Sequence, residues 1–439
     1  MCILGIDVGT TTVSAVVISL KDGEALESVT VKNDSFIQTE KKGERIQSVE
    51  KIAEKVQTIA RDLTEKYDVK SIGVTGQMHG ILYYDRKGRA VSPLYTWQDE
   101  RALIPLSSGK TSVEEIKELT GYDVPSGYGL ATHYYNVKSG LVPKEAVGLC
   151  TIGDYIVCSL IGLIPKMHAS NGASLGLFNL KLNRFDENAL KAVGIDPKFI
   201  PPVTSSARIA GIYNGIPVSV AIGDNQASFI GSVSDVDNGI LLNVGTGSQV
   251  SATTEYKELK HCELRPLLGS KYLAVGCSLC GGRAYALLEK FFSAFARELG
   301  VEGEMYSIME KLASTAKEPL KVVTTFSGTR KNPDLKGRIE DIDEENFTPS
   351  ALTLGFIHGM IDELYGYAQD LDKKTLLVGS GNGIKRNPIL VECAEKKFGA
   401  ELKIPRNNEE ASVGACLFAG VSLGLFPSLA SAGKLIRYN

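Results

Sequence analysis

The feature that most constrains the fold of this chain is a short sequence pattern that occurs twice, once in each half. Residues 3–12 read ILGIDVGTTT, an apolar strand that contains Asp7 and ends in a tip of Gly9 and three threonines; VSAVVISL (13–20) follows at once. Residues 240–252, ILLNVGTGSQVSA, repeat the strand, the Gly-Thr tip and the returning strand, with Asn243 at the place of Asp7. Each copy predicts a β-hairpin, and the repeat predicts two similar halves.

The tips of these hairpins carry the chemistry of a phosphate site. Both offer small side chains, backbone N–H groups and hydroxyls, which together suit phosphate oxygens. Asp7 can hold Mg²⁺ through the waters of the ion, and Asn243 at the equivalent place avoids a second carboxylate that would repel the phosphates. For either copy alone, an ordinary tight hairpin is the alternative interpretation. The predicted tip residues are Gly9, Thr10, Thr11, Gly245, Thr246 and Gly247.

Length and charge narrow the class of protein. The 439 residues suffice for two domains with substantial cores. A net charge of −3 and a pI near 6.1 give no electrostatic footprint for nucleic acid or an anionic membrane. No window approaches the ~20 apolar residues that span a bilayer, and the N-terminus begins with a core strand instead of a signal peptide. We therefore expect a cytoplasmic protein with no nucleic-acid or membrane partner.

The eight cysteines are scattered, mostly within apolar runs, and are expected to be buried thiols. Cys277 and Cys280 form one CxxC pair. Because the sequence has no second ligand pair at metal-site spacing, we do not predict a metal or redox role for them.

The remaining segments alternate between helical and strand patterns. Helices are predicted at 44–67, 281–299, 349–371, 386–398 and 409–424, and buried strands at 70–76, 216–224 and 375–381. The segment 80–97 predicts a hairpin that turns at Lys87–Gly88. This alternation favours α/β domains with mixed sheets. The seam is expected near 235–239, which gives domains of residues 1–236 and 237–439, with relative motion between them.

A polar group of residues follows two strands of the first half, in GQMHG (76–80) and TWQDER (96–101). A sugar can stack its C–H face on the indole of Trp97 while its hydroxyls bond to His79, Asp99 and neighbouring amides. The alternative is a structural histidine, a core tryptophan and a surface pair of Asp99 and Arg101.

Asp224, in GDNQAS, follows a strand and begins a helix. The helix dipole favours its ionised form, so Asp224 can accept a proton at neutral pH. A simple N-cap is the alternative. A phosphate site, however, implies an acceptor, and an acceptor hydroxyl benefits from a general base.

Taken together, these motifs resemble the FGGY carbohydrate kinases, within the actin, Hsp70 and hexokinase-like ATPases. The resemblance covers nearly the whole chain and includes GIDVGTT, VTGQMHG, TWQDER, AIGDNQAS, NVGTGS, FSGTR, GSGN with Arg386 and Asn387, and EEASVGACLFAG. It implies two ribonuclease-H-like domains with mixed sheets and an active-site cleft between them, with sugar and the catalytic Asp in the first domain and nucleotide in the second.

The resemblance also implies roles for individual residues. Asp224 is implied as the general base, and Asp7 as the residue that positions Mg²⁺ near ATP. Asp99 and Arg101 have the alternative role of bracing their loop. The implied sugar-site residues are Gln77, Met78, His79, Trp97, Asp99, Asp224 and Asn225. The implied nucleotide-site residues, besides the hairpin tips, are Gly282, Gly328, Gly379, Ser380, Gly381, Asn382 and Asn387.

Within the family, QMHG is similar to xylulokinases and sedoheptulokinases, whereas glycerol kinases usually have Arg-Glu there. LYTWQDER, GYGLAT, CTIGDYIVCSLIGL, SNGASLGLFN and SLCGGRAYALLEKF are most similar to sedoheptulokinases. The chain departs at Cys280, where relatives have Asn, and at Ser48, where many have Asp after Gln47. The family resemblance implies that this last segment lies far from the chemistry. The chain is also rather short, which implies trimmed loops in the second domain.

The function expected from this resemblance is ATP-dependent phosphorylation of a ketose at its terminal primary hydroxyl, with sedoheptulose as the first choice and D-xylulose as the alternative. A non-catalytic sensor would be expected to have lost Asp7 or Asp224, or to carry a DNA-binding helix pair. A chaperone-type ATPase would be expected to continue into a peptide-binding domain. The family includes homodimers, which leaves the oligomeric state open.

Overall fold

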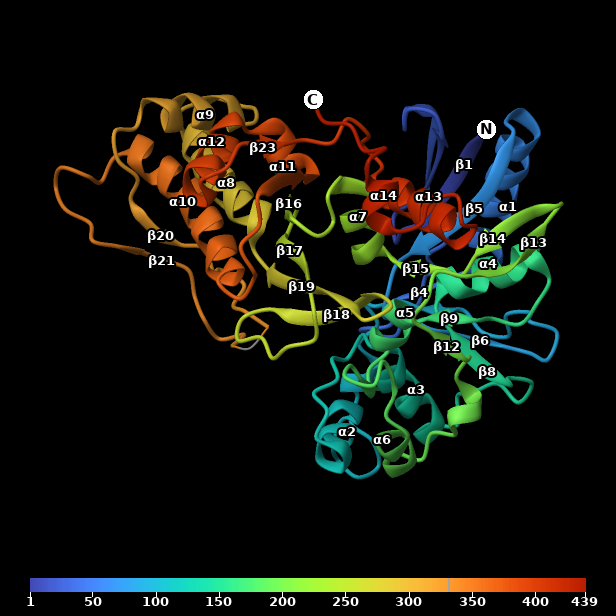
Figure 1. The fold of residues 1–439 in the computed structure, drawn as a ribbon. Coiled ribbons are helices and arrows are strands. Elements are labelled where there is room, and N and C mark those ends of the chain that lie inside the picture. The colour runs from blue at the N-terminus through green and yellow to red at the C-terminus, as the bar shows by residue number, and fades with distance from the viewer. Residues whose placement is uncertain (331) are drawn as a thin grey trace. The chain divides into compact units, whose positions relative to one another are not determined.

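The chain forms two compact units. The computed structural model describes residues 1–330 and 332–439 (Figure 1). Unit 1 comprises residues 1–234, 265–272 and 407–437, and unit 2 comprises residues 235–264, 273–406 and 438–439. Unit 1 thus includes two segments, 265–272 and 407–437, that come after residue 236 in the sequence. The division into functional domains at 236/237 stays a prediction.

The first part of the chain contains the strands β1 (Cys2–Val8), β2 (Thr12–Ser19), β3 (Ala25–Lys32), β4 (Ile46–Gln47), β5 (Val69–Gly76), β6 (Leu82–Tyr84), β7 (Leu94–Tyr95), β8 (Gly148–Cys150), β9 (Met167–His168), β10 (Phe178–Asn179), β11 (Arg184–Phe185), β12 (Val203–Thr204), β13 (Ile209–Tyr213), β14 (Ile216–Ser219) and β15 (Ile222–Gly223). Its helices are α1 (Val49–Lys66), α2 (Ser112–Thr120), α3 (Gly129–Lys138), α4 (Ile152–Ile161), α5 (Ala169–Ala173), α6 (Glu187–Ala192) and α7 (Asp224–Ser232).

The second part contains the strands β16 (Gly239–Val244), β17 (Ser248–Thr254), β18 (Glu263–Leu268), β19 (Lys271–Ser278), β20 (Lys321–Val323), β21 (Arg338–Glu340), β22 (Leu376–Ser380) and β23 (Leu402–Lys403). Its helices are α8 (Gly281–Glu298), α9 (Tyr306–Thr315), α10 (Pro349–Ala368), α11 (Gly381–Arg386), α12 (Pro388–Phe398), α13 (Glu410–Ser422) and α14 (Leu429–Gly433).

The main sheet of unit 1 is mixed, with strand order β13-β14-β5-β1-β2-β3 and β15 also paired with β5. β1 runs antiparallel to β2, as the first hairpin predicts, and parallel to β5. β15 also runs parallel to β5. The carboxyl ends of β1, β5 and β15 therefore meet at one edge of this sheet, and loops at such an edge are where open α/β sheets bind ligands.

Helix α13 approaches this sheet very closely, because glycines leave room for its backbone. A Cβ on Gly5 of β1 would lie 1.9 Å from the Ser412 carbonyl oxygen, and one on Gly73 of β5 would lie 2.0 Å from that of Ala415. Against α7, a Cβ on Gly414 would lie 1.8 Å from the Ala227 carbonyl oxygen. The small-residue run 411–420 is therefore a packing surface that ties the C-terminal segment to β1, β5 and α7.

Unit 2 repeats the local topology of the first hairpin. Its sheet has strand order β18-β19-β17-β16-β22-β23, in which β16 is antiparallel to β17 and parallel to β22. Asp7 pairs with Thr75 of β5, and Asn243 pairs with Ser380 of β22. The prediction of two similar hairpins, each leading a mixed sheet, is therefore confirmed.

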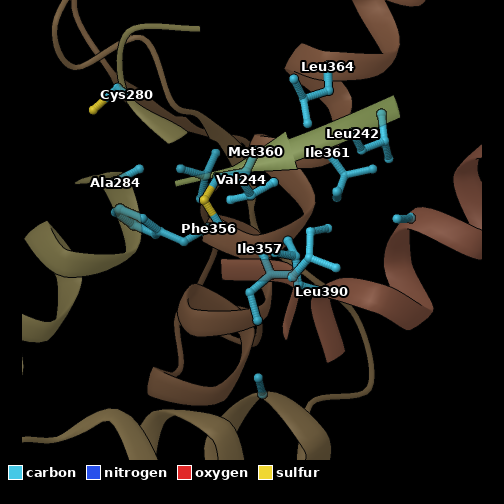
Figure 2. Packing of buried hydrophobic residues seen from close by; sticks show 14 of the residues in the cluster. Leu242, Val244, Cys280, Ala284, Phe356, Ile357, Met360, Ile361, Leu364 and Leu390 are labelled. Carbon is cyan, nitrogen blue, oxygen red and sulfur yellow. The ribbon is translucent and has the colours of Figure 1, made fainter. Parts of the chain in front are cut away.

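The core of unit 2 lies between its sheet and α8, α10 and α12. Figure 2 shows Leu242 and Val244 of β16 among side chains of α8, α10 and α12. Val244, which is buried, immediately precedes the second tip. The tip is thus anchored at its base by apolar packing.

Most of the predicted elements are confirmed, and two are confirmed in part. The helix predicted at 44–67 begins only at Val49, because Ile46–Gln47 forms β4. The segment 80–97 turns at Lys87–Gly88, and its arms make isolated bridges at Ile81–Tyr95 and Tyr84–Ala90. Its two strands, however, pair elsewhere, β6 with β8 and β7 with β4. The cysteines are free thiols, most of them buried. Among the described residues, no helix is both long and apolar enough to cross a membrane.

Candidate active site

Asp224 lies where β15 ends and α7 begins. Gly223, not Asp224, is the N-cap residue of α7, so the simple capping role is not the one that Asp224 plays. Its carboxylate accepts hydrogen bonds from the backbone N–H groups of Asn225 and Met78, and the cation of Arg265 faces it. These three contacts favour the ionised form.

The pKa of Asp224 is nevertheless raised, to about 6, because burial penalises the charge more than its partners stabilise it. The expectation that the helix dipole would hold this carboxylate in its ionised form is corrected to that extent. A carboxylate with a pKa near 6 is still mostly ionised at pH 7 and is a better proton acceptor than an ordinary aspartate.

Asp7 lies near the end of β1, and β5 lies between β1 and β15 in the sheet. Burial, together with the negative charges of Asp224 and Glu409, raises the pKa of Asp7 to about 7. Its Oδ1 atom is buried and has no hydrogen-bond partner among the described residues. A buried carboxylate oxygen without a protein partner fits a cation or a water of its hydration shell.

The Met78–His79 loop follows β5 at the same sheet edge. Met78 is buried. His79 has a left-handed backbone (φ 73°), its Nδ1 lies 2.8 Å from the Ser174 carbonyl oxygen, and its ring stacks on that of Tyr128 at 4.3 Å. A non-glycine residue held in this conformation by several contacts is typical of a functional loop.

Trp97 and Gln77 both meet the first hairpin tip at Thr10. The Trp97 indole N–H donates to Thr10 Oγ1 (3.0 Å), and the Thr10 hydroxyl donates to Gln77 Oε1 (3.3 Å). Trp97 keeps 47% of its surface exposed, so it is not a core tryptophan and its ring is available to a ligand.

Asp99 and Arg101 form a buried pair that braces the loop after β7. Asp99 Oδ1 accepts from Arg101 Nε (2.7 Å), and Asp99 Oδ2 accepts from the backbone N–H of Arg45 (2.9 Å). The Arg101 guanidinium also lies over the Tyr95 ring, 4.1 Å from its centroid. Since both carboxylate oxygens are already bonded, this geometry favours the bracing role over contact with a sugar.

The second hairpin tip is closed by the start of α8. The N–H groups of Gly282 and Arg283 donate to the carbonyl oxygens of Gly245 and Thr246, at 2.9 and 3.0 Å. A Cβ on Gly282 would lie 2.3 Å from the Gly245 oxygen, so glycine is required for this contact. Asn243 Nδ2 donates to Ser380 Oγ (2.8 Å), which ties the tip to β22.

A cavity of about 840 Å³ opens beside this tip within unit 2. Such a volume accommodates a ligand of nucleotide size. The predicted residues that line it are Gly245, Thr246, Gly282, Gly381, Asn382 and Asn387. The first-tip residues Gly9, Thr10 and Thr11 belong to unit 1, and the predicted residues of unit 2 outside the described lining are Gly247, Gly328, Gly379 and Ser380.

Packing accounts for the last two of these. A Cβ on Gly379 would lie 2.5 Å from the Leu402 side chain, and Ser380 is buried against Asn243. Gly328 takes part in a turn closed by its N–H bond to the Thr325 carbonyl oxygen (3.0 Å).

Several residues of these two sites escaped the sequence analysis. Tyr285 and Tyr306 line the cavity with stacked rings 6.0 Å apart. Arg265 faces Asp224, and Glu409 faces Asp7. Tyr285 lies within the quoted motif SLCGGRAYALLEKF and Glu409 begins EEASVGACLFAG, but the sequence analysis assigned neither of them a role. Tyr306 and Arg265 lie outside the quoted motifs.

Gln47 corrects one expectation. Its segment was expected to lie far from the chemistry, yet Gln47 Nε2 donates to the Thr10 carbonyl oxygen of the first tip (2.9 Å). The reason is the pairing of β4 with β7, which brings Gln47 beside the Trp97 loop.

The chain is similar to known proteins in both sequence and fold. Residues 2–236 match the FGGY family of carbohydrate kinases, N-terminal domain. The chain is 27% identical to the sedoheptulokinase of Mus musculus, over 90% of this chain and 92% of the relative. Its fold is similar to solved xylulose kinases from Lactobacillus acidophilus (TM-score 0.84, 21% identity, 100% and 92% of the two chains) and Rhodospirillum rubrum (0.85, 17%, 100% and 93%).

Proposed function

We propose that this chain, which belongs to the FGGY family of carbohydrate kinases, phosphorylates the terminal primary hydroxyl of a ketose with ATP. The observation that carries this proposal is Asp224. Its carboxylate lies at a strand end beside the Met78–His79 loop, with a pKa of about 6. A general base of that pKa suits a sugar hydroxyl, which must lose its proton as the new O–P bond forms.

Sedoheptulose is our first choice of acceptor and sedoheptulose 7-phosphate the product. The 27% identity to a sedoheptulokinase over nearly the whole length of both chains supports this choice. D-Xylulose is the alternative. The similar xylulose kinase structures support the fold alone at their level of identity, so they do not decide between the two sugars.

In the proposed reaction, the acceptor stacks on Trp97, and its terminal hydroxyl donates a hydrogen bond to Asp224. As the hydroxyl oxygen attacks the γ-phosphorus of ATP, the bond to the β,γ-bridging oxygen breaks and ADP leaves. The hydroxyl proton passes to Asp224. In a loose phosphoryl transition state, positioning and electrostatics supply most of the acceleration, so backbone N–H groups of the tips are proposed to bind the phosphate oxygens.

The cavity of unit 2 is proposed as the nucleotide site. The stacked rings of Tyr285 and Tyr306 offer an apolar aromatic wall for the adenine. Arg283 and Arg386, which also line the cavity, supply positive charge for phosphates. Both features are in keeping with a substrate that has an apolar base at one end and anionic groups at the other.

The residues present fit a magnesium ion, as the family implies. The buried Oδ1 atom of Asp7 has no described protein partner, and a carboxylate oxygen is a preferred Mg²⁺ ligand. Asp7 would hold the ion, through a water molecule, and the ion when bound neutralises charge on the phosphates. A nearby cation would also lower the pKa of Asp7, which burial and two carboxylates raise in its absence.

The first experiment is ADP release with MgATP across sedoheptulose, D-xylulose, D-ribulose, L-ribulose and glycerol, ranked by kcat/KM. A lead for sedoheptulose supports both the reaction and the acceptor. A lead for D-xylulose keeps the mechanism and replaces the sugar. No release with any of the five, with ATP still bound, would favour a non-catalytic sensor on this fold.

A further inference from the structure

Four hydrogen bonds around Thr10 connect the Trp97 loop to the first hairpin tip. Trp97 Nε1 donates to Thr10 Oγ1 (3.0 Å), and the Thr10 hydroxyl donates to Gln77 Oε1 (3.3 Å). Gln77 Nε2 donates to Gln47 Oε1 (2.8 Å), and Gln47 Nε2 returns to the Thr10 carbonyl oxygen (2.9 Å). The last three bonds form a closed ring of Thr10, Gln77 and Gln47. Trp97, which is partly exposed to solvent, is bonded to this ring at Thr10.

All four bonds run in one direction, so each one fixes the next. Because Thr10 Oγ1 accepts from the indole, its own proton is directed to Gln77. Gln47 is fully buried (0% exposed), so bulk solvent does not reach its amide if the ring opens. Aligned bonds in such surroundings strengthen one another, and losing one leaves a costly unsatisfied group.

The position of Gln47 is itself fixed by a short sheet. Gln47 pairs with Leu94 in β4–β7, and the backbone N–H of Thr96 donates to the Arg45 carbonyl oxygen (3.0 Å). Trp97 follows immediately. The strand that carries Gln47 and the loop that carries Trp97 therefore form one rigid piece, and the ring connects this piece to the tip.

A second buried amide holds the same tip by a different route. Asn33 Nδ2 donates to the Gly9 carbonyl oxygen, and the Asn33 N–H donates to that of Thr11, both at 2.8 Å. Since Asn33 already fixes the backbone of the tip on both sides of Thr10, holding that backbone is not the distinctive contribution of Gln47. Its distinctive contribution is the connection through Gln77 and the Thr10 hydroxyl to Trp97.

We propose that Gln47 is a positioning residue that couples acceptor binding at Trp97 to phosphate binding at the Gly9–Thr11 tip. The coupling rests on the function proposed above, which brings an acceptor to Trp97 and a phosphate to the tip. An acceptor stacked on the indole holds the N–H toward Thr10, and the ring passes this constraint to the Thr10 hydroxyl and carbonyl. By linkage, phosphate bound at the tip changes the affinity for the acceptor at Trp97 by the same factor as the acceptor changes the affinity for phosphate.

The test uses the emission of Trp97, the single tryptophan of the chain. Full-length wild type, Gln47→Met and Asn33→Ala are titrated with MgATP in the absence of sugar, and calorimetry checks nucleotide binding independently. Gln47→Met keeps the length of the side chain and removes its hydrogen bonds, whereas Asn33→Ala weakens the tip and leaves the ring in place. Thermal unfolding verifies that each variant is folded.

We expect MgATP to change Trp97 emission in wild type and Asn33→Ala, and by less than about half as much in Gln47→Met, although all three bind nucleotide. The variant keeps the direct Trp97–Thr10 bond but loses the two bonds of Gln47 that hold Thr10 and Gln77 in place. With sedoheptulose and MgADP, the sugar Kd should tighten by about fivefold or more in wild type, and by less than about twofold in Gln47→Met. Equal emission and sugar-Kd responses in wild type and Gln47→Met would overturn the coupling. An unchanged Trp97 emission in wild type, when calorimetry shows that nucleotide is bound, would overturn it as well.

The two proposals fail separately. If Trp97 emission reports nucleotide through Gln47 while no ketose is phosphorylated, the coupling stands and the ketose kinase assignment falls. If sedoheptulose is phosphorylated and Gln47→Met lowers kcat and stability while the coupling persists, Gln47 is merely structural and the proposal is wrong. If calorimetry detects no nucleotide binding to wild type, both proposals are overturned.

Discussion

Replacing Asp224 with Asn should remove activity and at the same time stabilise the fold above neutral pH. As the proposed general base, Asp224 accounts for about 10²–10⁴-fold in phosphoryl transfer. Burial raises its pKa from 3.8 to about 6, so the folded protein holds this proton more tightly than the unfolded chain does. Stability due to this group is therefore fully present below pH 3.8 and is lost as the pH rises through 6.

The size of this effect follows from the pKa shift. A shift of that size corresponds to about 3 kcal/mol at pH 8 and about 1 kcal/mol at pH 4.5, since each pH unit within the window contributes about 1.4 kcal/mol. Asn carries no charge that burial can penalise. Asp224→Asn should thus unfold at higher urea than wild type, with the larger advantage at pH 8.

The assay combines ADP release under saturating MgATP with urea unfolding at the two pH values. Asp85→Asn serves as control, because Arg89 lowers the pKa of Asp85 and its loss should destabilise the fold while leaving transfer unchanged. Undiminished turnover in Asp224→Asn would remove this residue from the mechanism. A variant less stable than wild type at pH 8 would refute the claim that burial, and not partner contacts, dominates its charge.

Four further outcomes are expected. Wild-type kcat/KM for the acceptor should fall about tenfold from its plateau by pH 5, because Asp224 must be ionised; a profile flat to pH 5 would contradict this. Trp97→Ala should raise the acceptor KM about tenfold and Trp97→Phe much less, as stacking requires; similar KM values for the two would count against a stacking platform. Asp99→Ala should lower the free energy of unfolding by about 2–3 kcal/mol, because the buried Arg101 loses one of its two carboxylate partners and keeps Glu44; an unchanged stability with a raised sugar KM would restore Asp99 as a sugar ligand. Tyr285→Ala should raise the KM for ATP about tenfold with the acceptor KM unchanged, and an unaltered ATP KM would place the base elsewhere.

Local patterns predicted the elements of this fold well, because each was marked within its own segment. The two hairpins combine apolar strands with small tips, and α1 has apolar residues at helical spacing, buried at Ile52, Val56 and Leu63. The α8, α10 and α12 helices were found within a few residues of their ends. Residues at these strand ends, such as Asp7 and Asp224, could be proposed for the same reason.

What could not be predicted depends on contacts between distant segments. The 411–420 run was recognisable as a helix, but its place against β1 and β5 follows from glycines some 340 to 410 positions earlier. Arg265 was invisible because no local signal directs a strand residue toward Asp224. Gln47 was misjudged because the sequence analysis placed it within a helix predicted at 44–67, whereas residues 46–47 form β4, whose pairing with β7 brings Gln47 to Thr10.

The two hairpins show how one repeated pattern acquires two chemical roles. Asn243 donates its amide hydrogen to Ser380, a bond that a carboxylate could not donate, so this position is satisfied within the protein. Asp7, at the equivalent register, has a buried oxygen without a described protein partner and a pKa raised by burial and by two neighbouring carboxylates. A group left in that state destabilises the free protein, and a bound cation would relieve it. The Asp-to-Asn difference therefore leaves the first tip, and not the second, with a buried carboxylate oxygen that a cation would satisfy.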